Sequence, residues 1–165
     1  IYGDHDNSIK DKADYEKFLG RELNALDMEQ IMNQVPLLIR LPDGENAGVY
    51  SDAAGMMNVT PSILHLLGVS SEPYYWIGSH LFDEEPRLIP LRSGAFSDEK
   101  VFYLPSETAG LEGGTCYDLV TRQPTDIQAC RDGYDETQKQ LKISDQVITY
   151  DLLKQFKTQG GAETK

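Results

Sequence analysis

Apolar positions recur with a helical period in the first part of the chain and then give way to a continuous apolar run. From Ser8 to about Asn24, apolar residues fall at helical spacing with charges between them, and a second short helix is predicted from Asp27 to Asn33. Residues 35–41 are nearly all apolar and are followed by the turn sequence of residues 42–44. This run predicts a strand buried on both faces, as in the central sheet of an α/β protein.

A further helix is predicted between Thr60 and Gly68. Thr60 can cap the helix, and Pro61 would occupy the first helical position, where its missing N–H costs nothing. Gly68 supplies the stop. The apolar face of this helix is predicted to consist of Ile63, Leu64, Leu66 and Leu67.

After about Arg87 the pattern becomes that of short strands. Residues 88–96, 101–104 and 115–120 are separated by polar or Gly-rich turns, which predicts an antiparallel sheet. Thr125 and Gln128 then have the spacing of a capping box at the start of a long terminal helix. Gly133 weakens its first turns, so two helices are an alternative to one. The apolar stripe of this region comprises Tyr134, Leu141, Val147, Ile148, Leu152 and Phe156.

These segments together predict an α/β protein with three parts. Residues 1–86 form the last part of an α/β sheet core, residues 87–157 form a small antiparallel sheet with a long C-terminal helix, and residues 158–165 form a disordered tail. A length of 165 residues suits one domain or a large part of a bigger one. Since the chain starts at Ile1, within what resembles the end of a buried strand, we expect it to be a fragment.

The net charge of the chain argues against some classes of binding partner. The net charge is −12 and the isoelectric point is about 4.5, which argues against nucleic acid, because phosphate binding needs clustered Lys and Arg. The same acidity would attract a divalent cation and repel an anionic lipid surface. No apolar run approaches the length of a membrane span, and no signal peptide is visible.

Asp4 and His5 are the candidate metal ligands. A carboxylate beside an imidazole, placed directly after a buried strand, suits Mn²⁺ or Zn²⁺. Ligand sites in open α/β sheets lie at the carboxyl ends of the strands, where this pair is expected. The alternative is a strand-end turn in which Asp4 caps the following helix and His5 is exposed. Spacing alone leaves both interpretations open, because two adjacent ligands do not make a complete site.

Cys116 and Cys130 lie fourteen residues apart and are either bridged or two reduced thiols. In an exported protein a bridge would be worth about 3 kcal/mol. Cys116 as a nucleophile has no supporting motif or neighbouring His. The sequence also contains no Gly-x-Ser-x-Gly elbow, no P-loop and no Cys-x-x-Cys pair.

Three other features are assigned structural roles. His65 is interpreted as a packed or edge residue of its helix, and His80 as a hydrogen-bonded loop residue. Residues 74–76, Tyr-Tyr-Trp, are interpreted as a loop anchor, with a glycan or lipid-headgroup surface as the alternative.

Three elements, in this order, resemble the later part of lipoteichoic acid synthases: residues 2–5 (Tyr-Gly-Asp-His), residues 35–39 and residues 58–69. Those enzymes are sulfatase-like members of the alkaline phosphatase superfamily. The resemblance continues through residues 78–82, 90–94, 121–124 and 144–147, so it covers nearly the whole chain. It implies that residues 1–86 complete an alkaline phosphatase-like core, and that the chain is the carboxy-terminal portion of such a protein.

The resemblance implies a phosphoglycerol transferase that builds glycerolphosphate polymer from phosphatidylglycerol. In the family a Thr nucleophile, a Glu, an Asp and a His surround Mn²⁺, and the Asp and His correspond to Asp4 and His5. Zn²⁺, Mg²⁺ and Ca²⁺ are alternative cations. The Thr and Glu lie upstream of this chain in the family, so no catalytic nucleophile is assigned here. We therefore expect these residues to be inactive alone and to bind Mn²⁺ weakly.

The resemblance also implies a location and partners. The domain is expected to face outward at the cell membrane of a Gram-positive-type bacterium, held by N-terminal transmembrane segments outside this chain, or to be released. Copies of the chain could associate through strand edges left open at residues 1–2 and 35–41.

The chain departs from the family in three places. Asn58 stands where many superfamily members have Asp, and we interpret it as structural; residues 6–7 are more polar than expected, and the two cysteines lie outside the family pattern. A sulfatase or phosphodiesterase of the same superfamily and a non-catalytic cell-surface binding module are the alternative functions.

Overall fold

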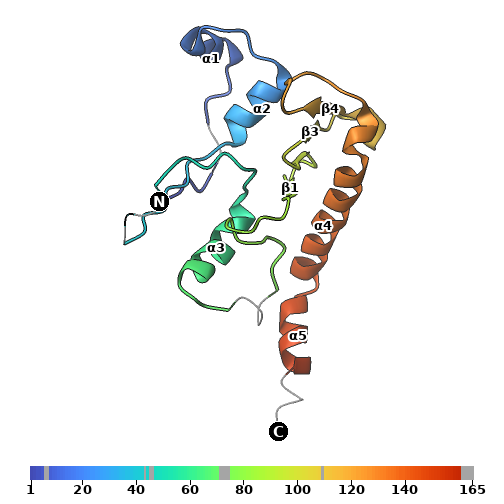
Figure 1. The fold of residues 1–165 in the computed structure, drawn as a ribbon. Coiled ribbons are helices and arrows are strands. Elements are labelled where there is room, and N and C mark those ends of the chain that lie inside the picture. Colours follow the sequence, from blue (N-terminus) through green and yellow to red (C-terminus); the bar gives the residue numbers. More distant parts are fainter. Residues whose placement is uncertain (6–7, 43, 45–46, 71–74, 109, 161–165) are drawn as a thin grey trace. The chain divides into compact units, whose positions relative to one another are not determined.

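The computed structural model describes residues 1–165 except residues 6–7, 43, 45–46, 71–74, 109 and 161–165 (Figure 1). The chain forms two compact units, Ile1–Ser51 and Asp52–Lys165, which are described here in turn. The predicted α/β class, with an antiparallel sheet followed by a long helix, is confirmed. The predicted division at residue 86 stays a prediction.

The first unit contains two short helices, α1 (Lys12–Leu19) and α2 (Ala25–Asn33). The predicted helix from Ser8 to Asn24 is too long at both ends. Asp11 caps α1 by accepting a hydrogen bond from the Ala13 N–H, and Gly20 ends it in the left-handed conformation, with φ of 69°. The predicted helix at Asp27–Asn33 is α2, which begins two residues earlier because Asn24 and Asp27 form a reciprocal capping box.

The apolar run of residues 35–41 does not form the doubly buried strand that was predicted. It makes a single antiparallel bridge, between Tyr2 and Leu37, supported by hydrogen bonds from Gly3 N–H to the Pro36 carbonyl and from Leu38 N–H to the Ile1 carbonyl. Leu38 is 60% exposed and Ile39 is 43% exposed. The prediction fails because, within the described residues, only the segment at Ile1–Gly3 pairs with this run.

The second unit opens with a 3₁₀ turn, η1 (Met56–Asn58), that leads into α3 (Val59–Leu66). The cap therefore lies at Asn58, and the predicted cap at Thr60 is wrong. The stop at Gly68 is confirmed, since this residue has φ of 67°. The buried residues of the helix are Pro61 and Ser62, whereas Ile63, Leu66 and Leu67 of the predicted apolar face are exposed.

A four-stranded antiparallel sheet follows, with its strands in sequence order: β1 (Ile89–Pro90), β2 (Phe96–Ser97), β3 (Val101–Leu104) and β4 (Thr115–Asp118). The predicted strand at 88–96 is two strands, because a turn at residues 91–95 with Gly94 at φ of 90° divides it. The predicted strand at 115–120 ends two residues early, where the Asp118 carboxylate accepts hydrogen bonds from Val120 and Thr121.

Two further 3₁₀ turns, η2 (Leu111–Gly113) and η3 (Ile127–Cys130), lead to α4 (Arg131–Thr149), which runs along the sheet, and to α5 (Leu152–Gly160) (Figure 1). The predicted Thr125–Gln128 capping box is wrong, because the Asp126 carboxylate accepts the hydrogen bond from the Gln128 N–H. The C-terminal region does form two helices, α4 and α5, but they are separated at Tyr150 and Asp151 and not near Gly133.

Gly133 lies inside α4 for a packing reason. A Cβ atom at this position would overlap the ring of Phe96, a completely buried residue of β2. The glycine therefore lets the helix backbone approach the sheet closely, which compensates for its poor helix propensity. Residues 158–160, predicted as the start of a disordered tail, belong to α5, and residues 161–165 lie outside the described residues.

The main core lies between the sheet and α4. The Phe96 and Tyr103 rings stack with centroids 5.6 Å apart, and Tyr134 of α4 meets Tyr103 edge-on at 5.3 Å. Cys116 of β4 and Cys130 of η3 form a disulfide, one of the two alternatives left open by the sequence, and are themselves buried in this core. The buried cluster consists of Phe96, Val101, Tyr103, Leu111, Cys116 and Cys130.

Candidate metal centre

Backbone pairing next to the apolar run positions the first candidate ligand. Gly3 donates its N–H to the Pro36 carbonyl at 2.9 Å, and a Cβ atom on Gly3 would lie 2.9 Å from the Val35 Cβ. A larger residue at position 3 would push the two segments apart. The glycine thus allows the close pairing that fixes the backbone immediately before Asp4.

Asp4 and His5 lie side by side at the end of this pairing. Asp4 Oδ1 and His5 Nε2 are 3.9 Å apart, and the two side chains are 79% and 81% exposed. Two ligand atoms, each about 2.1 Å from one metal ion, can lie up to about 4.2 Å apart. The observed separation lies below this upper limit, and the exposure leaves room for further ligands and for a substrate.

The alternative interpretation of this pair is wrong in one respect. Asp4 does not cap the following helix, because Asp11 is the N-cap of α1. His5 is exposed, as that interpretation expected. In the part of the chain that the structure describes, no group of three or more His, Cys, Asp or Glu side chains is arranged to hold a metal ion. Residues 6–7, noted as more polar than expected, lie outside the described residues.

The other two histidines form a ring cluster in the second unit. The centroids of the His65 and His80 rings are 4.0 Å apart, and the Phe82 ring lies 5.5 Å from that of His65. His80 Nδ1 is buried without a hydrogen-bond partner among the described residues, so the predicted hydrogen-bonded loop role does not hold for this atom. His65 is exposed and its ring contacts those of His80 and Phe82, which agrees with the edge position, one of the two predicted alternatives.

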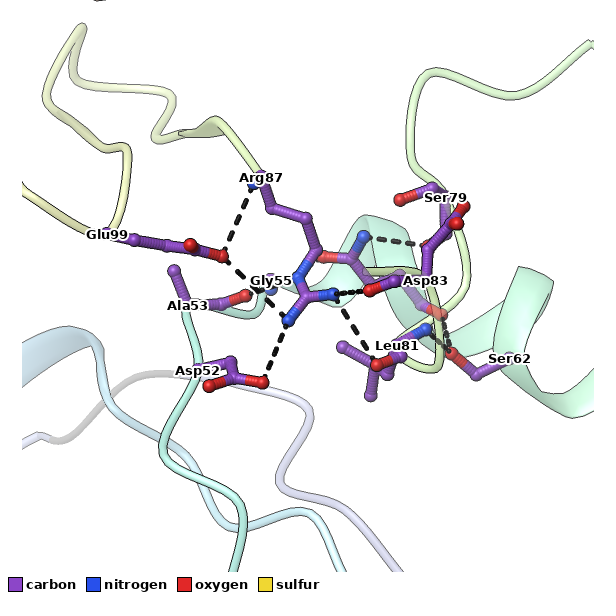
Figure 2. A network of polar contacts seen from close by, with 10 residues as sticks. Asp52, Ala53, Gly55, Ser62, Ser79, Leu81, Asp83, Arg87 and Glu99 are labelled. Carbon is purple, nitrogen blue, oxygen red and sulfur yellow. Dashed lines mark hydrogen bonds and ion pairs between the residues drawn. The ribbon is translucent and has the colours of Figure 1, made fainter. Parts of the chain in front are cut away.

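Arg87 is a residue whose role the sequence did not indicate. Its side chain is 6% exposed, and its guanidinium donates hydrogen bonds to the carbonyls of Ala53 at 2.8 Å and Asp83 at 3.1 Å (Figure 2). The same group lies 3.5 Å from the Asp52 carboxylate and 4.0 Å from that of Glu99. Figure 2 shows Arg87 at the centre of three segments: the one before α3, the 79–83 loop and the β2–β3 turn.

The contacts of Arg87 indicate a structural role, because its donors are directed at backbone carbonyls and paired carboxylates. A buried charge is tolerated only when it is satisfied in this way. The only sequence signal is an isolated Arg between Pro86 and Leu88, which gives no hint of its partners. The carbonyls it binds lie up to 34 residues away along the chain.

Asn58 lies in the same region as the Arg87 network, and its contacts support the interpretation of Asn58 as a structural residue. The side chain is 1% exposed, accepts a hydrogen bond from Gly55 N–H and donates one to the Ser79 carbonyl at 2.8 Å. An Asp carboxylate could not donate the second bond. Ser62 similarly donates to the Asn58 carbonyl and accepts from Leu81 N–H. These contacts fix the 79–81 loop against α3.

The aromatic loop is only partly described. Tyr75 is 68% exposed and its ring lies 5.1 Å from that of Phe156 in α5, while Trp76 is 40% exposed. Tyr74 lies outside the described residues. The Tyr75–Phe156 contact supports the interpretation of a loop anchor. Among the described residues, no helix is both long enough and apolar enough to cross a membrane.

Comparison with known proteins shows that the chain is similar to lipoteichoic acid synthases. This similarity confirms the resemblance inferred from the sequence. The matching proteins include those of Staphylococcus aureus strains USA300, NCTC 8325 / PS 47 and bovine RF122 / ET3-1. Each is 28% identical over 159 residues, or 95% of this chain. The chain spans 23% of the length of these relatives. No protein-family model matches it.

Proposed function

We propose that this chain is the carboxy-terminal part of a metal-dependent phosphoglycerol transferase, in which Asp4 and His5 supply two ligands to Mn²⁺. The observation that carries the proposal is the similarity to lipoteichoic acid synthases over 95% of the chain. The 3.9 Å separation of the two ligand atoms supports it. The remaining ligands and the Thr nucleophile would belong to the longer polypeptide.

Each residue of the pair has a distinct part. Asp4 contributes a negative charge that offsets the charge of the cation, and His5 binds through Nε2 as neutral imidazole, with its proton on Nδ1. A divalent cation held there would act as a Lewis acid toward a phosphate oxygen and a nucleophilic hydroxyl. Because both side chains are about four-fifths exposed, the ligands are accessible to a phospholipid headgroup.

The reaction proposed for the longer protein is a two-step transfer. The Thr hydroxyl attacks the phosphorus of phosphatidylglycerol, the bond from phosphorus to the diacylglycerol oxygen breaks, and diacylglycerol leaves with a proton. The terminal hydroxyl of a growing glycerolphosphate polymer then attacks the phosphoglycerol-Thr ester and releases Thr. This chemistry would take place on the outer side of the membrane, where the Cys116–Cys130 disulfide is stable.

The test uses the longer protein, including the upstream region, and compares Asp4→Ala with Asp14→Ala. Asp14 is an exposed residue of α1 outside the candidate site, and its replacement by Ala removes the same charge. We expect Asp4→Ala to lose bound Mn²⁺, measured by mass spectrometry of metals, and to lose phosphoglycerol transfer, while Asp14→Ala keeps both. Unchanged Mn²⁺ occupancy in a folded Asp4→Ala protein would contradict the proposal.

A second candidate function is a non-catalytic cell-surface binding module. The observation that favours it is that Asp4 and His5 have no third ligand within the described residues. Metal retention in Asp4→Ala would support it. A sulfatase or phosphodiesterase is the other enzymatic alternative, and the upstream nucleophile separates it from the transferase: a Cys or Ser in a Cys/Ser-x-Pro-x-Arg motif indicates a sulfatase, whereas a Thr indicates the transferase.

A further inference from the structure

A groove lined by polar and apolar groups lies beside α4 in the second unit. It has a volume of about 530 Å³ and is bounded by the face of α4 from Gln138 to Thr149, by Tyr150 at the end of this helix and by Arg92 of the β1–β2 turn. Residues 138, 142, 145, 146 and 149 share this face because they lie three or four positions apart on the helix. The groove is therefore a product of the docking of α4 against the sheet.

The groove carries a positive charge in an acidic protein. Arg92 and Lys142 contribute two positive charges and Asp145 contributes one negative charge, so the lining has a formal charge of +1, whereas the chain has −12. Lys142 makes no ion pair among the described residues. Arg92 Nη2 lies 2.7 Å from Asp145 Oδ1, and a guanidinium has further N–H donors beyond the one used in this pair.

The uncharged lining adds groups that recognise hydroxylated carbon chains. Gln138 and Gln146 supply amide donors and acceptors, Thr149 supplies a hydroxyl, and Leu141 and Tyr150 supply apolar surface. A ligand that alternates an anionic group with short hydroxylated carbon segments would use all of these groups at once. Nucleic acid also carries phosphodiesters, but the net charge of −12 disfavours a partner whose successive phosphates must be neutralised.

We infer that this groove binds a phosphorylated polyol, with a phosphodiester at Arg92 and Lys142 and hydroxyl groups at Gln138 and Gln146. The identity of this ligand rests on the proposed function: for a phosphoglycerol transferase, it is the glycerolphosphate polymer. Asp145 opposes binding of an anion, while its ion pair restrains the Arg92 side chain.

The first experiment titrates the full 165-residue chain with glycerophosphoglycerol, the smallest diester of this type, and follows the amide signals of α4 by NMR. Lys142→Gln is compared with Lys139→Gln, which has the same charge change on the same helix but pairs with Glu136 and does not line the groove. We expect Lys142→Gln to weaken binding about fivefold and Lys139→Gln to leave it within about twofold. Equal effects of the two variants would overturn the inference.

Asp145→Asn tests the sign of the ligand charge. Removing this carboxylate raises the charge of the lining, so binding of glycerophosphoglycerol should tighten and should weaken as salt is added. Weaker binding in Asp145→Asn, with an unchanged melting temperature, would overturn the inference. Tighter binding of glycerol alone than of the diester would also overturn it, because the ligand would then be a neutral polyol.

Inorganic phosphate and glycerophosphoglycerol separate the two parts of the ligand. The diester should bind more tightly, because it also engages the amide and hydroxyl groups; equal binding of both would exclude a polyol subsite and overturn the inference. No metal is added in these titrations. If glycerophosphoglycerol does not bind to the groove, the transferase proposal is unaffected. If the transferase proposal fails, the measured binding of the diester still stands.

Discussion

The first 51 residues and the sheet with its long helix differ in how they are built. Ten of the twelve buried hydrophobic residues in the described part of the chain lie between residues 89 and 130, and only Leu23 and Leu26 lie in the first unit. The candidate metal ligands belong to the unit with few buried residues. Chemistry and packing are thus assigned to different regions, and a substitution should affect mainly one of them.

The comparison also shows what holds each region in place. Asp4 and His5 follow a single bridge with a few backbone hydrogen bonds, whereas α4 is held by aromatic stacking and a disulfide. A pair held by so few contacts can adjust to further ligands from a longer polypeptide. A closely packed core has no such freedom.

The sharpest test of this difference replaces one large apolar residue in each region. Phe96→Ala removes a completely buried ring and should lower the free energy of unfolding by about 3–5 kcal/mol. Leu38→Ala removes a side chain that is 60% exposed and should change it by less than about 0.5 kcal/mol. Urea unfolding of the 165-residue chain measures both. Similar losses would show that residues 35–41 are buried in solution.

The disulfide is the next largest contribution. Replacing both Cys116 and Cys130 by Ser should destabilise the chain by about 3 kcal/mol, since the bridge closes a loop with a separation of fourteen residues. Thermal unfolding of the double variant, with the oxidised and reduced parent chains as references, measures this loss. A parent chain whose melting temperature does not respond to reductant would contradict it.

Gly133→Ala tests the close approach of α4 to the sheet. The new methyl group would overlap the Phe96 ring, so we expect destabilisation by about 1–3 kcal/mol although alanine favours helix. Gly48→Ala is the control, because no atom lies near its added Cβ. A gain in stability for Gly133→Ala in chemical unfolding would mean that the helix can move away from the sheet at little cost.

The smallest effect concerns acid stability at the end of β4. Hydrogen bonds from the Thr121 N–H and hydroxyl lower the pKa of Asp118 below its ordinary value of 3.8. The folded state therefore holds this proton more weakly than the unfolded state. The carboxylate stabilises the fold above the ordinary pKa, and this contribution is lost as the pH falls through the folded value. Asp118→Asn should reduce the slope of melting temperature against pH below about pH 4. An unchanged slope would contradict this assignment.

Local patterns predicted the sheet and terminal helix well, because the signals lie within the elements themselves. Residues 101–104 form the predicted strand, and Cys116 and Cys130 are bridged, which was one of the two alternatives. Some errors occurred where distant residues decide the outcome. The N-cap position of α3 is Asn58 and not Thr60, and the Asn58 side chain donates to the carbonyl of Ser79, twenty-one residues away. The contacts of Arg87 are equally invisible in the sequence.

The candidate site was predictable only as a pair of adjacent ligands. The Asp4 and His5 side chains do lie together, but adjacency along the chain makes this a modest success. The predicted strand at residues 35–41 depended on its apolar composition, and composition cannot state which segments pair with it. The metal itself stays a prediction, because no third ligand is arranged with Asp4 and His5 within the described residues.

The Cys116–Cys130 bond has a practical consequence for handling the protein. It encloses residues 117–129, a stretch that includes the highly exposed Val120. A protease that cuts once inside this stretch would leave both pieces covalently joined. The nicked molecule would migrate as an intact chain in electrophoresis without reductant and separate into two bands once thiol is added, so integrity should be judged on a reducing gel.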